Sequence, residues 1–285
     1  MRNIGFIGAG KVGFSLGKYL AQSGEHITGY FSKSLTSAQL AADFTKTKVY
    51  KSIHELVRDN DTLFLTVPDG AIGEIWDYMR NLSIENKNIC HCSGSIASTA
   101  FFDAQNKGAF AYSVHPLYAI NDKFTSWQNL THAYFAIEGS AGHLDEITAI
   151  FKRAGNTVIT MDTNQKALYH AAAVMASNLI TSLFDLSSQM LTKCGFTKEN
   201  AMQALLPLLT GNVANIAKFG TKDALTGPIE RNDVQTVQNH LLAFKQNDEF
   251  MAQEIYKLLS QNLIKLAQEK YPSRDYTKLR EVVNK

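Results

Sequence analysis

The chain has 285 residues, of which 45% are hydrophobic and 19% charged, and its formal net charge is +2. This length predicts two domains or one large domain, with enough apolar residues for a full core. The small net charge and the scattered basic residues give no reason to expect a nucleic acid or an anionic membrane as a partner. Three cysteines without framework spacing are typical of a reducing compartment, and an apolar strand that begins at residue 3 leaves no room for a signal peptide. We therefore expect a cytoplasmic protein.

Short apolar runs alternate with helical patterns as far as residue 162. This alternation predicts an α/β fold, with crossover helices and a mostly parallel sheet of the Rossmann type. The runs of strand length are 4–7, 26–31, 62–67, 88–92, 110–114, 133–137 and 157–161, and the helical patterns include 12–22, 53–58, 71–81 and 143–154.

Helical patterns follow one another after Asp162, and no strand-like run is evident. We therefore predict a dinucleotide-binding domain over 1–162 and an all-helical substrate or dimerisation domain over 163–285. The helical patterns are 163–193, 197–218, 230–245 and 248–269, separated by turn signals at Gly195, Gly220 and Gly227-Pro228.

A G-x-G-x-x-G pattern follows the first predicted strand and opens the first helix. Such a loop lets backbone amides and a helix N-terminus approach a pyrophosphate with no side chain between them. A glycine-rich turn without a nucleotide is the alternative, but the position of the loop between strand and helix favours a nucleotide. The residues expected at the cofactor are Gly8, Ala9, Gly10, Lys11, Val12 and Gly13.

The end of the second strand indicates which dinucleotide is bound. Enzymes that use NAD place an acid there for the ribose 2′-hydroxyl, but no Asp or Glu lies between Glu25 and Asp43. The loop offers Ser32, Lys33 and Ser34 instead, and a cation with two hydroxyls suits a 2′-phosphate. We expect NADP(H), with a solvated turn as the alternative reading of these three residues.

Three later strands end in polar residues, at 66–69, 91–95 and 113–117. Ligands of an open parallel sheet bind at the carboxyl ends of its strands, so these segments should line the nicotinamide and substrate end. We expect Val67, Pro68 and Ser93 at the cofactor and His115 at the substrate, although His115 could also be a core histidine.

Cys90, His91 and Cys92 could suggest a metal site, but strand alternation points the two cysteines to one face and His91 to the other. We expect no metal.

The segment 167–184 contains no charged residue, which predicts a helix buried around most of its girth. It is barely long enough to span a membrane, and its polar residues argue against that role. At 100° per residue, Lys166, His170 and Ser177 share one stripe of this helix. A reductase needs a proton donor beside the carbonyl oxygen, which His170 or Lys166 could supply, and Asn178 could orient the substrate. A hydrogen-bonded core helix with an incidental histidine is the structural alternative.

Six motifs together carry a family resemblance: "GFIGAGKVG", "VPDGAI", "HCSGS", "HPLYAI", "YHAAAVMASN" and "LTGPIERNDVQTVQNHL". From residue 1 to about 260 the chain resembles the Rossmann-like family of NADP oxidoreductases whose C-terminal half is a 2520-type domain of formerly unknown function. One branch of that family comprises the alternative ketopantoate reductases. The resemblance implies a C-terminal domain of the 6-phosphogluconate dehydrogenase type, a homodimer, and NADPH-dependent reduction of a small 2-oxo acid. Ketopantoate, which is reduced to pantoate in pantothenate biosynthesis, is the substrate that it favours.

Reductases similar to this family place a catalytic lysine, and an asparagine one or two turns later, on the equivalent helix. His170 stands here at the lysine position and Asn178 two turns on, whereas Val174 replaces the asparagine that ketopantoate reductases carry in between. That departure leaves the proton donor open between His170 and Lys166.

The motif "LTGPIERND" suggests Thr226 and Arg231 as a grip for a substrate carboxylate, with a turn and a helix-start cation as the alternative. Two other functions stay open. One is reduction of another substrate, such as a hydroxyacid, a cyclic imine or a deazaflavin, and the other is a non-catalytic NADP(H)-sensing protein.

Overall fold

The computed structural model describes residues 2–284. The chain forms two compact units, Met1–Ala176 and Ser177–Lys285. The first unit therefore includes the strands and also the first helix after them. The boundary at residue 162 marks instead the change from strand to helix patterns in the sequence, and it stays a prediction.

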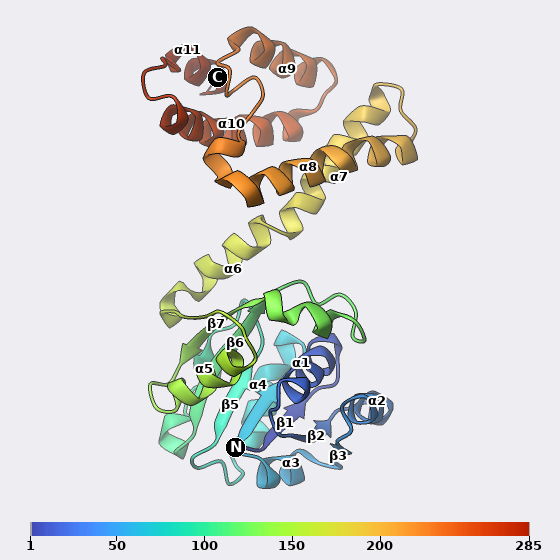
Figure 1. The fold of residues 1–285 in the computed structure, drawn as a ribbon, viewed down its shortest axis with the longest axis vertical. Coiled ribbons are helices and arrows are strands. Elements are labelled where there is room, and N and C mark those ends of the chain that lie inside the picture. The colour runs from blue at the N-terminus through green and yellow to red at the C-terminus, as the bar shows by residue number, and fades with distance from the viewer. Residues whose placement is uncertain (1, 285) are drawn as a thin grey trace. The chain divides into compact units, whose positions relative to one another are not determined.

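An eight-stranded sheet forms the centre of the first unit, in the order β3-β2-β1-β4-β5-β6-β7-β8 (Figure 1). Every neighbouring pair is parallel except β6 and β7. The order from β3 through β1 to β5 is that of a Rossmann fold, so the predicted mostly parallel sheet is confirmed. The strands are β1 Ile4–Ile7, β2 Ile27–Phe31, β3 Lys48–Val49, β4 Thr62–Leu65, β5 Asn88–His91, β6 Phe110–Leu117, β7 Tyr134–Gly139 and β8 Val158–Thr160.

Helices cover both faces of this sheet, which explains why β1 and β4 are buried at every residue. The core on one face includes residues of α1 (Lys11–Gln22), α2 (Leu35–Thr45) and α5 (Leu144–Arg153). The core on the other face includes residues of α3 (Ile53–Asp59) and α4 (Asp69–Met79). Short 3₁₀ turns lie at η1 Ser98–Ala100, η2 Gln105–Lys107, η3 Ser126–His132 and η4 Thr163–Gln165.

Strand β6 extends beyond the predicted end at residue 114. Its antiparallel neighbour β7 continues the ladder, pairing His115 with Ala136 and Leu117 with Tyr134. His115 therefore lies inside a strand rather than in the loop after it, and its ring direction is set by the pleat of the sheet.

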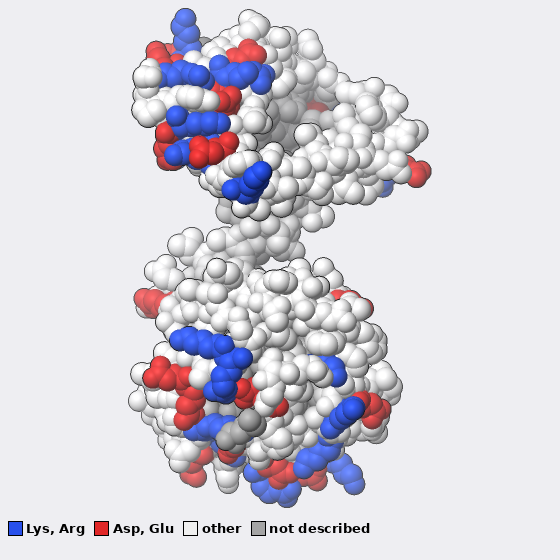
Figure 2. All heavy atoms as spheres, in the orientation of Figure 1, with Lys and Arg blue, Asp and Glu red and all other residues white. Residues whose placement is uncertain are grey.

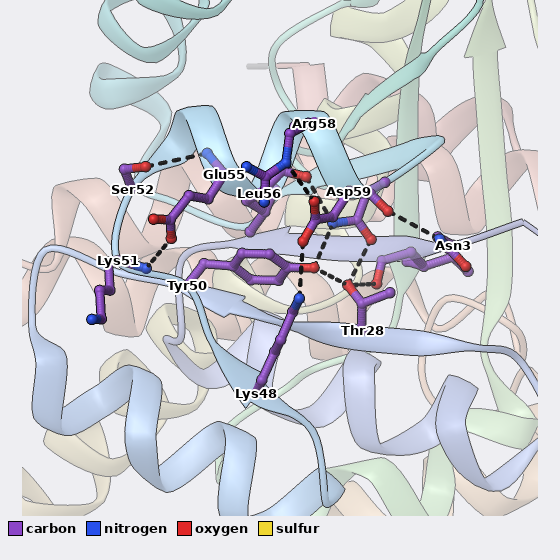
Figure 3. A network of polar contacts seen from close by, with 12 residues as sticks. Asn3, Thr28, Lys48, Tyr50, Lys51, Ser52, Glu55, Leu56, Arg58 and Asp59 are labelled. Atoms are coloured by element: carbon purple, nitrogen blue, oxygen red, sulfur yellow. Dashed lines mark hydrogen bonds and ion pairs between the residues drawn. The ribbon is translucent and has the colours of Figure 1, made fainter.

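A polar network, buried at Asn60 and exposed at Arg58 and Lys48, lies beside the amino-terminal ends of β1 and β4, away from the strand ends expected to bind ligand (Figure 3). The Asn60 side chain, which is 1% exposed, accepts from Thr28 Oγ1 at 2.6 Å and donates to Leu56 O at 2.7 Å and Tyr50 Oη at 3.1 Å. Hydrogen bonds from Arg58 and Lys48 lower the pKa of Asp59 to about 2. These groups bind one another, and we interpret the network as structural.

The second unit consists of helices in the part that the structure describes, which confirms the predicted all-helical C-terminal region. Its helices are α7 Asn178–Lys193, α8 Lys198–Ala224, α9 Val234–Gln246, α10 Phe250–Lys270 and α11 Thr277–Asn284. Gly220 interrupts α8 with φ 75°, at a predicted turn signal. Ile229 of the α8–α9 connection packs into the core of this unit with residues of α9, α10 and α11.

The prediction of one continuous helix over 163–193 is wrong, because the helix is interrupted at Ser177. The prediction that this helix is buried is also wrong. Helix α6 (Lys166–Met175) is followed by Ser177 at φ −130° and ψ −80°, and α7 begins at Asn178. Because of that break, the projection at 100° per residue holds only within α6. Lys166 is the buried residue of α6, whereas Leu168 is 69% exposed and Met175 63% exposed. The absence of charge in this segment therefore does not reflect burial within the chain itself.

Length and composition would allow the segment Thr163–Lys193 to cross a membrane. The hydrocarbon core of a bilayer requires about 20 consecutive helical residues. Helix α6 has 10 residues and α7 has 16, so the break at Ser177 leaves neither helix long enough to span it alone.

Candidate functional site

The glycine loop lies against the end of β4. Gly8 has φ +105°, and a Cβ there would overlap the carbonyl group of Thr66. A Cβ on Gly13 would overlap the Thr66 hydroxyl, which donates to Gly8 O at 2.9 Å. Both glycines are thus required by the packing of the loop on the sheet.

Gly10 has a different explanation, because a Cβ at this position would meet nothing within 4 Å. Gly10 is the N-cap residue of α1, its position carries no side-chain cap, and the first turn of the helix contains no acidic residue. The amides of that turn therefore have no side-chain partner from the cap, and an anion would satisfy them. The space above Gly10 and these amides fit the pyrophosphate of a dinucleotide.

The loop after β2 exposes a cation. Ser34 caps α2 by accepting from Ser37 N at 3.2 Å, and Ser32 Oγ accepts from Ser34 N at 3.4 Å. The Lys33 side chain is 82% exposed, and its Nζ lies 4.0 Å from the carboxylate of Glu74, whose side chain is 76% exposed. An exposed pair of this kind contributes little, so Lys33 is able to turn toward a bound phosphate.

The loops after β4 and β5 meet at Asp69, the first residue of α4. Asp69 Oδ2 accepts from Ser93 Oγ at 2.9 Å and from Ser95 Oγ at 2.8 Å. Ser93 Oγ also accepts from the Ile96 amide at 3.0 Å. Val67 lies beside the glycine loop, since a Cβ on Gly8 would be 2.9 Å from its Cγ1. Two of the three predicted polar strand ends therefore converge next to the glycine loop.

Lys166 is a buried cation beneath this edge of the sheet. It is 2% exposed, and its Nζ donates to Ser113 Oγ at 2.6 Å. Burial lowers the pKa of Lys166, and the negative charges of Glu138 and Asp69 act in the opposite direction. Glu138 is also buried, at 2% exposure, and accepts hydrogen bonds from Ser98 and Thr163.

Two histidines converge on Gly94, in the loop after β5. A methyl group on Gly94 would lie 2.7 Å from His170 Nδ1 and 2.8 Å from His115 Nε2. The two rings are nearly perpendicular, with centroids 6.3 Å apart. His115 Nδ1 lies 2.7 Å from the Tyr169 hydroxyl oxygen. His170 Nδ1 is buried and has no hydrogen-bond partner among residues 2–284. The structure thus joins His115 and His170, as residues of one candidate site, with Tyr169 and Gly94.

His91 and the neighbouring cysteines have structural surroundings. His91 Nδ1 accepts from Ser93 N at 3.2 Å, and Nε2 lies 3.2 Å from Ala97 O. Burial lowers the pKa of His91 to about 4. Cys90 and Cys92 pack on the core that contains α1, and burial raises the pKa of Cys92 to about 12. The predicted alternation of faces along β5 is confirmed, because the ring of His91 packs instead against Phe101 of the opposite core.

The remaining candidates belong to the second unit. Asn178 begins α7 and its side-chain oxygen accepts from Ser177 Oγ at 3.0 Å. Thr226 lines a cavity of about 350 Å³ whose walls come mainly from apolar residues of α7, α9 and α10. Arg231 is exposed, and its backbone amide donates to Gly227 O at 3.1 Å. Their contact with a substrate stays a prediction.

Tyr169 was not identified from the sequence as a site residue, whereas Gly94 and Ser113 lie in the polar segments 91–95 and 113–117 that were expected to line the site. Tyr169 precedes His170 and lies about 100° from it on the helix, outside the predicted polar stripe. The signal that could have revealed it is its place on the first helix after the sheet, one residue from a candidate donor.

Comparisons with known proteins agree with this architecture. Residues 1–116 match the model of a Rossmann-like domain, and residues 133–263 match the domain of unknown function DUF2520. A search of curated proteins gave no match.

Solved structures share the fold over nearly the whole chain. A protein from Thermotoga maritima is 24% identical with a TM-score of 0.77, covering 94% of this chain and 99% of its own. A proposed NADP oxidoreductase from Bacteroides fragilis is also 24% identical, with a TM-score of 0.69 and coverage of 93% and 98%. The 1-pyrroline-5-carboxylate reductase of Streptococcus pyogenes is 15% identical, with a TM-score of 0.63 and coverage of 95% and 98%.

The two matched models lie in the order that the fold requires, with the Rossmann-like domain on the sheet from β1 to β6 and DUF2520 starting before β7 and ending within α10. The chain therefore belongs to the family of proteins in which a Rossmann-like domain is followed by a DUF2520 domain.

Proposed function

We propose that this protein is an NADPH-dependent reductase of a small carbonyl compound, with ketopantoate as its substrate. One observation carries the proposal. A glycine loop suited to a pyrophosphate and two converging histidines lie at the same edge of one sheet. A sensor of NADP(H) has no use for histidines placed at that edge, whereas a reductase requires a proton donor there.

The cofactor part of the proposal assigns a role to each predicted residue. The uncapped turn at Gly10, Lys11 and Val12 would hold the pyrophosphate, and Lys33, with Ser32 and Ser34, would contact the 2′-phosphate. Reductive aminase structures from Aspergillus terreus, 14–16% identical to this chain, contain NADPH and support this choice. Bound NADPH would supply the hydride, and the protein residues would bind, orient and protonate.

The nicotinamide end would lie farther along the edge of the sheet. We assign Val67, Pro68 and Ser93 to it, because the first two residues follow β4 and Ser93 follows β5 beside Asp69. Ser93 is largely buried and hydrogen-bonded, so its position is fixed before a cofactor arrives.

We assign the proton donor to His170 rather than Lys166. The Lys166 ammonium is buried and already donates to Ser113, whereas His170 Nδ1 faces the space over Gly94 without a partner in the described chain. In the balanced reaction the substrate carbon gains the hydride, the electron pair of the C=O π bond moves to oxygen, and that oxygen takes a proton from His170. Asn178 would orient the carbonyl, and Thr226 and Arg231 would bind the substrate carboxylate.

A cyclic imine is the second candidate substrate. The solved structures with the same fold include pyrroline-5-carboxylate reductases and an imine reductase from Pseudomonas, at 12–15% identity. The experiment is a panel assay that follows substrate-dependent oxidation of NADPH by the purified protein with ketopantoate, 1-pyrroline-5-carboxylate and pyruvate. The proposal expects ketopantoate to give the highest kcat/KM. A higher kcat/KM for the imine would mean that the substrate is an imine and not a 2-oxo acid. Binding of NADPH without turnover of any compound would support the alternative of a non-catalytic NADP(H)-sensing protein.

The second unit has a surface that suits self-association, and we propose a cytoplasmic homodimer. No charged residue occurs between Ala201 and Ala217 of α8, and Figure 2 shows few charged residues on the surface over α8. Large apolar side chains there and on α7 are exposed. Exposed apolar side chains that gather on one surface often mark a protein–protein interface. The exposed residues include Leu179, Leu183, Met202, Leu206, Val213 and Phe219. Sedimentation equilibrium should give twice the monomer mass, and Leu206→Glu should shift the mass toward the monomer.

A further inference from the structure

We propose that His115 is a catalytic hydrogen-bond donor whose tautomer is fixed by Tyr169, so that the ring presents Nε2–H to the carbonyl oxygen of the substrate. The inference rests on the proposed reductase function and narrows its substrate class. A carbonyl oxygen accepts such a bond, whereas the nitrogen of a protonated imine has no lone pair to accept it. Tyr169 acts through His115 and is a positioning residue.

The geometry begins with the contact between β6 and α6. Tyr169 Oη lies 2.7 Å from His115 Nδ1, and the two rings are nearly perpendicular at 84°. This is the one hydrogen bond that the Tyr169 hydroxyl makes with residues 2–284. If Nδ1 carried the proton and donated to the tyrosine, the hydroxyl proton would lack an acceptor among those residues. If the hydroxyl donates to a bare Nδ1, both groups are satisfied.

Both groups have the charge state that this arrangement requires. Burial raises the pKa of Tyr169 to about 12, so its hydroxyl keeps the proton. Burial lowers the pKa of His115 to about 4, with smaller contributions in the same direction from Lys166 and His170 and an opposing one from Asp69. The His115 ring is therefore neutral at pH 7 and carries one proton. With Nδ1 accepting from Tyr169, that proton is on Nε2.

The Nε2 atom points to the space that His170 also faces. A methyl group on Gly94 would be 2.8 Å from His115 Nε2 and 2.7 Å from His170 Nδ1, so the two nitrogens approach one region above the loop. His170 Nδ1 has no hydrogen-bond partner in the described chain. A carbonyl oxygen bound there would accept Nε2–H from His115 while His170 supplies the proton that completes the hydroxyl. The neutral donor polarises the C=O bond without titrating near pH 7.

The tautomer is tested first, on the full-length protein without cofactor. The ¹⁵N spectrum of histidine-labelled protein distinguishes protonated from bare ring nitrogens, and His115→Gln assigns the signals by their loss. We expect Nε2–H and a bare Nδ1 for His115 in the wild type. In Tyr169→Phe we expect the other tautomer to become populated, whereas the exposed Tyr78→Phe control should match the wild type. A protonated Nδ1 in the wild type would overturn the inference.

The catalytic role is tested by kinetics with the best carbonyl substrate. Removal of a preorganised donor typically lowers kcat by about 10²–10³-fold, so we expect the kcat of His115→Leu to fall by that factor. The glutamine of His115→Gln returns an N–H near the Nε2 position. The kcat of this variant should therefore be at least about tenfold higher than that of His115→Leu. In Tyr169→Phe we expect kcat to fall by about tenfold with little change in KM. In the Tyr78→Phe control both constants should equal those of the wild type.

The kinetic outcomes separate this inference from the function on which it rests. Wild-type turnover together with kcat within twofold of wild type for His115→Leu would overturn the inference and leave the reductase intact. If kcat falls equally in His115→Gln and His115→Leu, His115 contributes to packing and not as a hydrogen-bond donor. A wild type that turns over no compound overturns the proposed function and the catalytic role of His115 together, and the spectra then decide the tautomer alone.

Discussion

Lys166 and His170 lie one turn apart on α6, and their surroundings predict opposite results when each is replaced. Lys166→Met removes the 2.6 Å hydrogen bond from a buried ammonium to Ser113. A hydrogen bond that involves a charged group contributes about 1.5–3 kcal/mol. In a unit of this size 1 kcal/mol shifts Tm by about 2–4 °C, so Tm should fall by roughly 3–12 °C. The kcat of the folded fraction should change little, by less than about tenfold.

His170→Ala should have the reverse effect. Its Nδ1 makes no hydrogen bond with the described residues, so its removal leaves no partner unsatisfied, and Tm should stay within about 3 °C of the wild type. Loss of a general acid should lower kcat by about 10²–10⁴-fold while NADPH binding is unchanged.

Thermal unfolding followed by circular dichroism and kcat at saturating NADPH, measured on four proteins, show whether Lys166 or His170 is the proton donor. They are the wild type, the two variants and Lys107→Met, which replaces an exposed lysine and should behave as the wild type. A Lys166→Met protein with normal Tm and kcat reduced more than 100-fold would instead make Lys166 the proton donor. Two destabilised variants with normal turnover would make α6 a structural helix.

Three further predictions concern the cofactor, the substrate and acid. Lys33→Ala should weaken NADPH binding by roughly tenfold and leave NADH binding unchanged, because a charge-assisted contact to a 2′-phosphate is lost. A fluorescence titration measures both affinities, and equal affinities of the wild type for NADPH and NADH would contradict this prediction. Arg231→Ala should raise KM by about tenfold or more at constant kcat, with the exposed Lys222→Ala as control, and unchanged kinetics would return Arg231 to a structural role. His91 has a folded-state pKa of about 4, below the unfolded value of 6.5. The unfolded chain therefore takes up the proton first, and stability present above pH 6.5 is lost as the pH falls to 4, by at most about 3 kcal/mol for this group. Urea unfolding at pH 7 and pH 4.5 should show this loss, and equal midpoints would contradict it.

The sequence predicted the architecture because its signals were local. Gly8, Gly10 and Gly13 stand between a strand and a helix, and their spacing needed no tertiary information. The place of His115 in β6 could not be predicted this way, because that strand is extended by pairing with β7, whose direction is opposite. Parallel strands were the reasonable default for an alternating pattern, and the antiparallel pair depends on the chain's path after residue 117.

The candidate site was predicted in part. Lys166 and His170 were expected on one face of a helix, and the structure places both at the carboxyl edge of the sheet. The prediction failed at Ser177, where backbone angles break the helix and end the regular 100° spacing. Tyr169 was missed because its role depends on a contact with a residue 54 positions away, which no spacing rule reports.

Transfer of deuteride from NADPH to a carbonyl carbon is the reaction that defines the proposed reductase. The purified protein is incubated with ketopantoate and NADPH carrying deuterium at the transferable position, and the product is analysed by mass spectrometry. We expect pantoate with one deuterium on the former carbonyl carbon, formed at a rate that falls by at least about 100-fold in His170→Ala. Binding of NADPH without label in any product, with ketopantoate or with the imine, would contradict it.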